Sequence, residues 1–319
     1  PAGVVRLARF VRPRAPGGPS VTVTTTAPDP VRPGGPAAAT DPGTDHAGEP
    51  GRVRRAAEWL RDVVVLTRRN LLHVRREPMQ MSDATVQPVL FTALFVYLLG
   101  GSMALPGGGS YTDFAIGGLV TMNLTTAALG TSVGLSSDLE TGVIDRFRTL
   151  PMARSAILAG RTLADLLASA LCATIVVLTG LAVGWRPDNG VAGVVAGLAV
   201  AVLFAYAFSW FCAILGLTSR DPESAQGLGM VIVFPLAFVS SCFVPTQGLP
   251  TVLRVIAEWN PTSAVAASCR ELFGNPNPAA LTDTFAARHP LFLALAWSVA
   301  IVAVCAPIAS RLQRRRITE

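Results

Sequence analysis

The chain has 319 residues, of which 51% are hydrophobic and only 14% are charged. A soluble domain carries about a quarter charged residues, so this composition predicts a protein that folds in a membrane. The net charge is +6, and every basic residue is an arginine. These arginines flank apolar stretches without interleaved aromatic residues, which argues against a nucleic-acid-binding surface.

Residues 1–50 are rich in proline, glycine, alanine and threonine. Such a segment buries too little apolar surface to offset the entropy lost on ordering, so we expect it to be disordered. Residues 51–83 contain a predicted helix, 58–77, with an apolar stripe and arginines on its other faces. This pattern is typical of a helix in the membrane interface, although a surface helix of a soluble domain is the alternative. The stripe consists of Leu60, Val63, Val64, Thr67, Leu71 and Val74.

Six apolar stretches follow, each about long enough for a helix to cross a bilayer core. They are residues 84–104, 112–135, 157–184, 191–217, 227–247 and 289–309. We therefore expect an all-α integral membrane protein with a six-span transmembrane domain, 84–309, and a basic cytoplasmic tail, 310–319. Arginines concentrate before the first stretch, in the 136–156 loop and in the tail, which predicts that both termini face the cytoplasm.

The 136–156 loop contains acidic residues that a bias toward positive cytoplasmic loops does not explain. After Gly142, apolar residues recur at helical spacing until Pro151 ends the pattern. A short two-sided helix of this kind is suited to docking into a groove on another protein, whereas a plain re-entry loop is the alternative. Ser136, Ser137 and Asp138 are expected to cap the turn before it. The apolar side consists of Val143, Ile144, Phe147 and Leu150, and the charged side includes Asp145, Arg146 and Arg148.

The segment DLETGVIDRFRTLPMARSAILAGRTLADLL resembles the signature of type 2 ABC export permeases, where it forms a coupling helix that contacts a separate ATPase. It departs from the usual pattern in having Val143 in place of threonine and Asp145 in place of glutamate, which are mild changes. The matching residues are Glu140, Gly142, Arg148, Leu150, Pro151 and Arg161. The resemblance together with the helical pattern predicts ATPase-coupling roles for Glu140, Gly142, Ile144, Arg146, Phe147, Arg148, Leu150, Pro151 and Arg161.

A second segment, SSCFVPTQGLPTVLRVIAEWNPTSAVAASCRELFGNP, resembles the part of the same family that follows the fifth span and forms short outer helices. A weaker third match is RREPMQM before the first span. The form is closest to the branch similar to the daunorubicin-resistance permeases. The matching residues of the second segment are Phe243, Pro245, Leu249, Pro250, Asn260, Pro261 and Arg270.

The resemblance implies a plasma-membrane exporter subunit that pairs with a second permease copy and moves a lipophilic drug, antibiotic or lipid-like molecule. It implies that ATP and Mg²⁺ bind to a separate ABC ATPase subunit. A chain without lysine cannot contain the P-loop signature G-x-x-x-x-G-K-[ST], which independently assigns ATP binding to a partner. We expect no metal or cofactor on this chain, and membrane lipids but no nucleic acid as further partners.

Other classes remain open or are disfavoured. An ion-coupled secondary transporter usually holds ionisable residues mid-membrane, whereas here the charges lie near the span ends. A glycan-exporting permease of the same superfamily is a close variant. The sequence has none of the motifs of an intramembrane enzyme, and a membrane anchor needs no charged loop helix.

Two further features concern packing. Gly193-x-x-x-Gly197 fits helix packing. The scattered cysteines are expected to be buried, with a Cys242–Cys269 disulfide left open.

Overall fold

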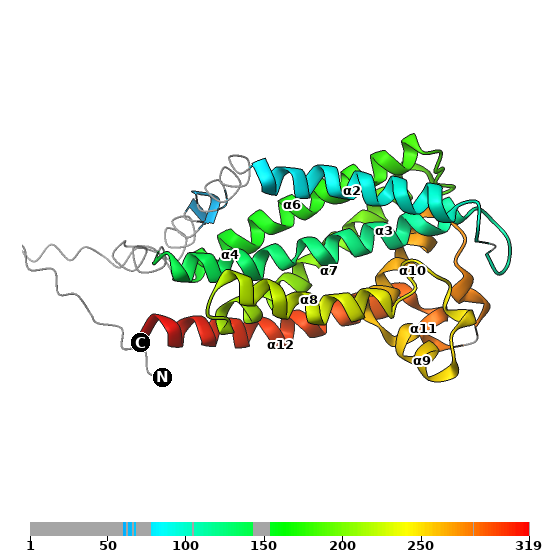
Figure 1. The fold of residues 1–319 in the computed structure, drawn as a ribbon. Coiled ribbons are helices and arrows are strands. Elements are labelled where there is room, and N and C mark those ends of the chain that lie inside the picture. Colours follow the sequence, from blue (N-terminus) through cyan, green and yellow to red (C-terminus); the bar gives the residue numbers. More distant parts are fainter. Residues whose placement is uncertain are drawn as a thin grey trace, which may run out of the picture. The chain divides into compact units, whose positions relative to one another are not determined.

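The structure is a computed structural model that describes residues 60–61, 63–65, 67, 78–103, 105–142, 154–282 and 284–318. These residues belong to one compact unit, 49–319. Every regular element in the described part of the chain is a helix (Figure 1), which confirms the predicted all-α class. Residues 1–50, which we predicted to be disordered, lie outside the described residues.

The helices fall into a long group and a short group. The long helices are α2 (Pro78–Leu99), α3 (Tyr111–Ala127), α4 (Leu129–Glu140), α6 (Arg154–Ala182), α7 (Gly190–Thr218), α8 (Pro222–Phe238) and α12 (Pro290–Thr318). The short helices lie between α8 and α12 in the chain: η1 (Thr246–Gly248), α9 (Thr251–Trp259), α10 (Pro261–Phe273), η2 (Pro278–Leu281) and α11 (Phe285–Arg288). Short helices after the fifth span are what the sequence predicted for this region.

Four helical stretches in the described residues are long and apolar enough to cross a membrane, as expected of a multi-pass membrane protein. They coincide with the second, third, fourth and sixth predicted spans. The first prediction falls on α2, whose apolar part is shorter, and the last span continues as helix through the predicted tail. The four stretches are Tyr111–Glu140, Gly160–Ala182, Gly190–Thr218 and Pro290–Gln313.

The fifth predicted span, 227–247, differs from the helix that forms there. Helix α8 begins at Pro222 and ends at Phe238, well before the predicted end. The Asn260 amide donates hydrogen bonds to the main-chain oxygens of Leu236 (2.7 Å) and Val239 (2.8 Å). A continuing helix would need these oxygens for its own N–H groups, so this side chain helps to end α8.

Side-chain caps explain why several helices begin where they do. Asp221 accepts a hydrogen bond from the Ser224 N–H at 2.7 Å, directly before Pro222 in the first turn of α8. Asn260 caps α10 in the same way and is followed by Pro261. A capping side chain followed by proline is a strong helix-start signal, because proline lacks the N–H that would be left unpaired.

Helix α10 is enclosed by α3, α7 and α12. Small residues on α7 make this possible: a Cβ at Gly193 would meet the Leu272 main-chain oxygen, and one at Gly197 would meet the Phe273 ring. The predicted packing role of Gly193-x-x-x-Gly197 is therefore confirmed. The two glycines let the backbone of α7 approach the C-terminal end of α10 closely.

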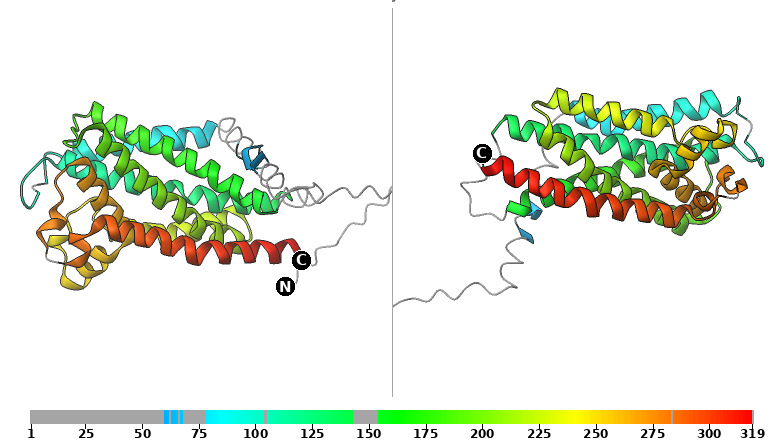
Figure 2. Two further views of the ribbon diagram at one scale, coloured as in Figure 1. Left: turned by 180° about the vertical axis from the view of Figure 1, so that it is seen from behind. Right: turned by 90° about the horizontal axis from the view of Figure 1, so that it is seen from below.

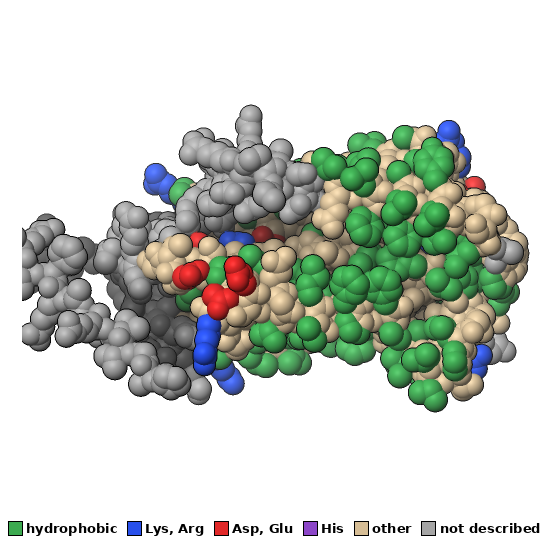
Figure 3. Space-filling view, in the orientation of Figure 1, with side chains coloured by type: hydrophobic (Ala, Val, Ile, Leu, Met, Phe, Trp, Pro, Cys, Tyr) green, Lys and Arg blue, Asp and Glu red, His purple; other side chains and the backbone are tan. Residues whose placement is uncertain are grey.

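The unit has two distinct ends, which the views in Figures 1 and 2 show consistently. One end carries α9, α10 and α11 together with the start of α12. The other carries the end of α4, the start of α6 and the C-terminal end of α12. Figure 3 shows hydrophobic side chains spread from the middle of one face to the first end, a group of acidic and basic side chains toward the second end, and a few charged side chains at the first end.

Candidate functional site

The first candidate site lies where α4 ends and α6 begins. Among the predicted coupling residues the structure describes Glu140, Gly142 and Arg161. Glu140 is exposed at the last position of α4, and Gly142 follows with a φ of +65°. This left-handed conformation favours glycine, so the chain leaves α4 at a defined point. Ile144, Arg146, Phe147, Arg148, Leu150 and Pro151 lie outside the described residues.

The expected caps before this point are not caps. Ser136, Ser137 and Asp138 lie inside α4, which runs further than the predicted span end at residue 135. The main-chain oxygen of Ser137 accepts from both the N–H (3.0 Å) and the hydroxyl (2.7 Å) of Thr141. Continued helical hydrogen bonding therefore extends α4 to Glu140, and Asp138 pairs with Arg161 of α6.

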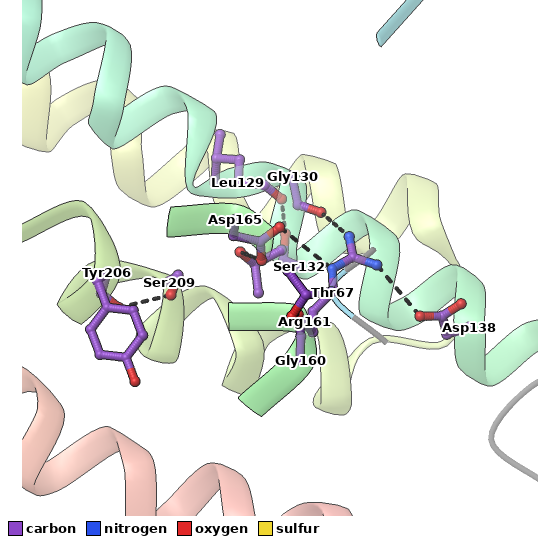
Figure 4. A network of polar contacts seen from close by, with 11 residues as sticks. Thr67, Leu129, Gly130, Ser132, Asp138, Gly160, Arg161, Asp165, Tyr206 and Ser209 are labelled. Carbon is purple, nitrogen blue, oxygen red and sulfur yellow. Dashed lines mark hydrogen bonds and ion pairs between the residues drawn. The ribbon is translucent and has the colours of Figure 1, made fainter. Parts of the chain in front are cut away.

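Arg161 joins α6 to α4 through its guanidinium group (Figure 4). Its Nη1 lies 3.4 Å from Asp138 Oδ2, and its Nη2 donates to the Gly130 main-chain oxygen at 3.1 Å. On its own helix, its Nε lies 3.6 Å from Asp165 Oδ1. We call Asp138, Arg161, Asp165 and Thr131 the arginine cluster; Thr131 donates its hydroxyl proton to Asp165 Oδ2 at 2.6 Å.

The arginine cluster is mostly shielded, with the Arg161 side chain 19% exposed. A glycine makes room for it: a Cβ at Gly134 would overlap the guanidinium group of Arg161. One turn earlier, a Cβ at Gly130 would meet nothing within 4 Å. Gly134 thus leaves the space that the Arg161 guanidinium occupies, whereas no side chain or backbone atom lies near the Cβ position of Gly130.

The predicted interfacial helix also reaches this site. Val63 and Thr67 are buried, whereas Leu60 and Val64 of the same predicted stripe are exposed. The Thr67 hydroxyl lies 2.8 Å from the Val63 main-chain oxygen and 3.2 Å from that of Gly160, which directly precedes Arg161. One edge of the stripe therefore packs on α6 and the other faces away from the described protein.

The second candidate site lies at the opposite end, around Arg270 of α10. This side chain is fully buried. Its Nη2 donates to the main-chain oxygens of Ser241 (2.6 Å) and Cys242 (3.3 Å), and its Nε donates to that of Phe114 at 2.8 Å. Burial lowers the pKa of Arg270 to about 10, so the group remains charged at neutral pH. Carbonyl dipoles and the Phe114 ring surround this cation.

The other residues of the outer motif join the same end. Phe243 stacks on Phe95 of α2 with ring centroids 4.6 Å apart, and its main-chain oxygen accepts from the Tyr111 hydroxyl at 3.0 Å. Asn260 binds the end of α8, as described above, and Pro261 opens α10. Pro245 and Pro250 directly precede η1 and α9. The structure thus brings Phe243, Asn260 and Arg270 together as ties between helices.

Sequence reasoning missed several members of these sites. Trp185 donates from Nε1 to Asn275 Oδ1 at 2.9 Å and so fastens the α6–α7 turn to the end of α10. Nothing in the spacing of these residues signals the contact. No sequence pattern indicated the contacts of Thr131 or Gly134. The i,i+4 spacing of Arg161 and Asp165, in contrast, could be recognised as a possible ion pair within one helix. Cys242 and Cys269 are both free and buried, so the disulfide left open does not form here.

The chemistry available at both sites is polar and structural. Among the described residues, no three His, Cys, Asp or Glu side chains lie together as metal ligands would. The arginine cluster ties α4 to α6, and Arg270 ties α10 to α3 and to the turn after α8. Both sets of contacts hold helices to one another.

Comparison with known proteins identifies the family. The family model described as ABC-2 type transporter matches residues 61–273. A daunorubicin resistance ABC transporter permease of Streptomyces coeruleorubidus is 33% identical over 248 residues, covering 78% of this chain and 84% of the relative.

Two more distant relatives are also named as permeases. A putative transport permease of Porphyra purpurea is 24% identical over 221 residues, covering 68% of this chain and 76% of the relative. A probable doxorubicin resistance ABC transporter permease of Mycobacterium tuberculosis is 23% identical over 272 residues, covering 83% and 93%. The chain therefore belongs to the ABC-2 type transporter family, as a membrane subunit of an ABC exporter.

Proposed function

We propose that this subunit exports a lipophilic drug, antibiotic or lipid-like molecule using ATP hydrolysed by a separate partner ATPase. Two relatives are named for resistance to daunorubicin and doxorubicin, which supports a drug-like cargo. The absence of lysine supports a separate ATPase, since the P-loop needs one. ATP and Mg²⁺ then bind to that partner and not to this chain.

The proposed arrangement has six spans in the plasma membrane, with α2 and α8 completing the four long apolar stretches. At 1.5 Å per residue, the 22 residues of α2 cover about 33 Å and the 17 residues of α8 about 26 Å, close to a bilayer core. This even number puts both termini on the same side of the membrane, and the distribution of arginines favours the cytoplasmic side. The domain limits we propose stay 1–50, 51–83, 84–309 and 310–319.

The observation that carries the coupling proposal is the arginine cluster. Residues 143–153 connect α4 to α6 in the chain. Arg161 of α6 binds Asp138 of α4, so the two helices are also joined by a side-chain contact. A displacement of the segment between them therefore moves α4 and α6 together. The Thr67 contact with Gly160 adds the interfacial helix to the same assembly. A coupling segment over Glu140–Pro151 would thus act on a joined group of helices.

A second permease copy is part of the proposal, because one six-span subunit is expected to enclose only half of a pathway. The outward faces of α2 and α8 are apolar, with Phe91, Leu94, Phe234 and Phe238 exposed. A pathway bordered by such faces favours a lipophilic cargo over an inorganic ion, which needs polar ligands along its route.

The test is purification of the chain in mild detergent from its native host, followed by identification of co-purifying P-loop ATPases. Glu140→Arg reverses an exposed charge at the end of α4, and Glu223→Arg makes the same change at an exposed position in the α7–α8 region of the same end. We expect an ATPase to co-purify, to be released by Glu140→Arg and to be retained by Glu223→Arg. Absence of any ATPase, or equal retention in both variants, contradicts the proposed coupling.

A further inference from the structure

Buried polar side-chain atoms without a hydrogen-bond partner fall into two groups in the described part of the chain. Those on the long helices are hydroxyl or N–H groups, and they are spread over α2, α4, α6, α7 and α12. The others are all oxygens of the segment between α8 and α12: Gln247 Oε1, Glu258 Oε1, Asn277 Oδ1 and Thr284 Oγ1. Every unpartnered amide or carboxylate oxygen among the described residues therefore belongs to this one segment.

The four oxygens come from four short helices that contact one another in a closed ring. Helix η1 contacts α9 and η2, and α11 contacts the same two helices. Figures 1 and 2 show α9 and α11 together at the end where α12 begins. Gln247 lies in η1 and Glu258 in α9, whereas Asn277 directly precedes η2 and Thr284 directly precedes α11. Each helix of the ring thus brings one unpartnered oxygen to the same small assembly.

The Gln247 amide joins η1 to η2 directly. Its Nε2 donates a hydrogen bond to the main-chain oxygen of Pro278, the residue after Asn277. This bond fixes which end of the amide is the nitrogen, so the atom left without a donor is an oxygen. Two residues with unpartnered amide oxygens therefore meet at the contact between η1 and η2.

Asn277 and Thr284 occupy helix-capping positions but do not act as caps. Asn and Thr are preferred there because the side-chain oxygen accepts from an N–H of the first turn. Asp221 and Asn260 do this at the starts of α8 and α10. Neither Asn277 nor Thr284 makes such a bond. Their side-chain oxygens are therefore available to another partner.

A shared cation is a partner that all four oxygens can accept. Buried oxygens without a donor are unfavourable, and a carboxylate oxygen most of all. Arg254 lies one turn before Glu258 on α9, but it gives Glu258 Oε1 no hydrogen bond. Carboxylate, amide and other oxygen ligands suit hard cations, which bind several of them at once.

We propose that Gln247, Glu258, Asn277 and Thr284 bind a calcium ion within the ring of η1, α9, η2 and α11. Calcium accepts about six to eight oxygen ligands in a flexible arrangement, whereas magnesium demands a near-ideal octahedron. The set contains one carboxylate only, so binding is weak, with a Kd on the order of 10⁻⁴–10⁻³ M, as in extracellular modules. Such a site revises our expectation that this chain carries no metal.

The ion joins four short helices and depends on neither ATP nor cargo. Only its position on the outer side of the membrane rests on the proposed function, through the topology given there. A chain without an ATPase partner still binds calcium if the site exists. The calcium site and the export function therefore fail separately.

The experiment uses the purified full chain in detergent and terbium, a calcium substitute that emits light when excited through a nearby tryptophan. Trp259 directly follows Glu258 in the chain. We expect terbium emission excited through tryptophan, and its loss as calcium is added. Glu258→Gln and Asn277→Ala should each weaken the competition by calcium about tenfold or more, since even changes beyond the direct ligands reach that size. Glu271→Gln, at an exposed position of α10 at the same end, is the matched control and should leave it unchanged.

Thermal unfolding with calcium or with a chelator separates binding from folding. Calcium should raise the unfolding temperature of the unsubstituted chain and of Glu271→Gln, but not that of Glu258→Gln. With the chelator, Glu258→Gln should unfold at the same or a higher temperature than the unsubstituted chain, because it removes an unpartnered carboxylate.

Two results would overturn the proposal. Absence of terbium emission together with an unfolding temperature that calcium does not change would show that these oxygens bind no cation. Equal competition by calcium in Glu258→Gln and Glu271→Gln would place the bound ion elsewhere on the chain.

Discussion

The guanidinium carbon of Arg270 lies 3.7 Å from the centroid of the Phe114 ring, while its Nε donates a hydrogen bond to the main-chain oxygen of the same residue. One residue of α3 thus supplies both a π-face and a carbonyl to a buried cation. Planar guanidinium groups can do both at once, whereas a lysine ammonium provides no comparable fork of donors. The tie between α3 and α10 is therefore specific to arginine.

Arg270→Lys should lower the thermal stability of the detergent-solubilised protein. The single ammonium group of lysine cannot donate to the main-chain oxygens of Phe114, Ser241 and Cys242 at the same time. Each buried charge-assisted hydrogen bond contributes on the order of 2 kcal/mol. Arg254→Lys on α9, where the side chain is only partly buried, is the control and should leave the unfolding temperature unchanged. Equal unfolding temperatures for both variants would show that Arg270 is not a critical tie.

Gly134→Ala should uncouple the permease without preventing its insertion. The added methyl group overlaps the present position of the Arg161 guanidinium, so that group must move, and we expect its contact with Asp138 to weaken. Gly130→Ala is the matched control on the same helix, because nothing lies near its Cβ position. Helix propensity alone would stabilise both variants by about 0.5–1 kcal/mol. We expect drug export to fall only in Gly134→Ala, measured at equal amounts of protein in the membrane.

Asn260 performs two tasks that a pair of substitutions separates. Asn260→Asp retains an oxygen that can accept from the Thr262 N–H, but it loses the amide donors to Leu236 and Val239. Asn260→Ala loses both. If the bond to α8 is the more important task, Asn260→Asp should be destabilised at least as much as Asn260→Ala, because its carboxylate would face two main-chain oxygens. A cap-dominated role predicts that Asn260→Asp resembles the unsubstituted protein, since loss of a cap costs about 1 kcal/mol.

The proposed topology is tested by a membrane-impermeant maleimide on intact cells. Pro106→Cys and Ser224→Cys both lie at exposed positions, on opposite ends of the described unit. We expect label at 106 in intact cells and at 224 only after permeabilisation. The reverse pattern would invert the orientation, and label at both positions in intact cells would contradict the three spans, second to fourth, that separate them.

Much of the fold could be predicted because bilayer thickness and helix geometry leave few alternatives for long apolar runs. Four predicted spans lie on helices of the expected kind. The fifth was placed too far along the chain because residues 239–247 are apolar enough to continue a helix. The Asn260 side chain, more than twenty residues later, helps to end α8, and the periodicity of a single sequence cannot reveal such a contact.

The sites were predictable to a different degree. The resemblance drew attention to Arg161, Asn260 and Arg270, which the structure shows to be ties between helices. Their partners are largely main-chain oxygens. Because every residue has a main-chain oxygen, the residue type does not indicate such a contact. Gly134 and Thr131 could be recognised only once α4 and α6 were placed side by side.

The enclosure of α10 has a consequence for biogenesis. Helix α10 packs against α3 and α7, which are synthesised before it, and against α12, which is synthesised last. With 13 residues it is too short to be inserted as an independent span. The side of α10 that packs against α12 therefore stays exposed until α12 has been synthesised. A chain that stops before α12 should consequently be recognised as incomplete and degraded, even though every partner of Arg270 has already been made.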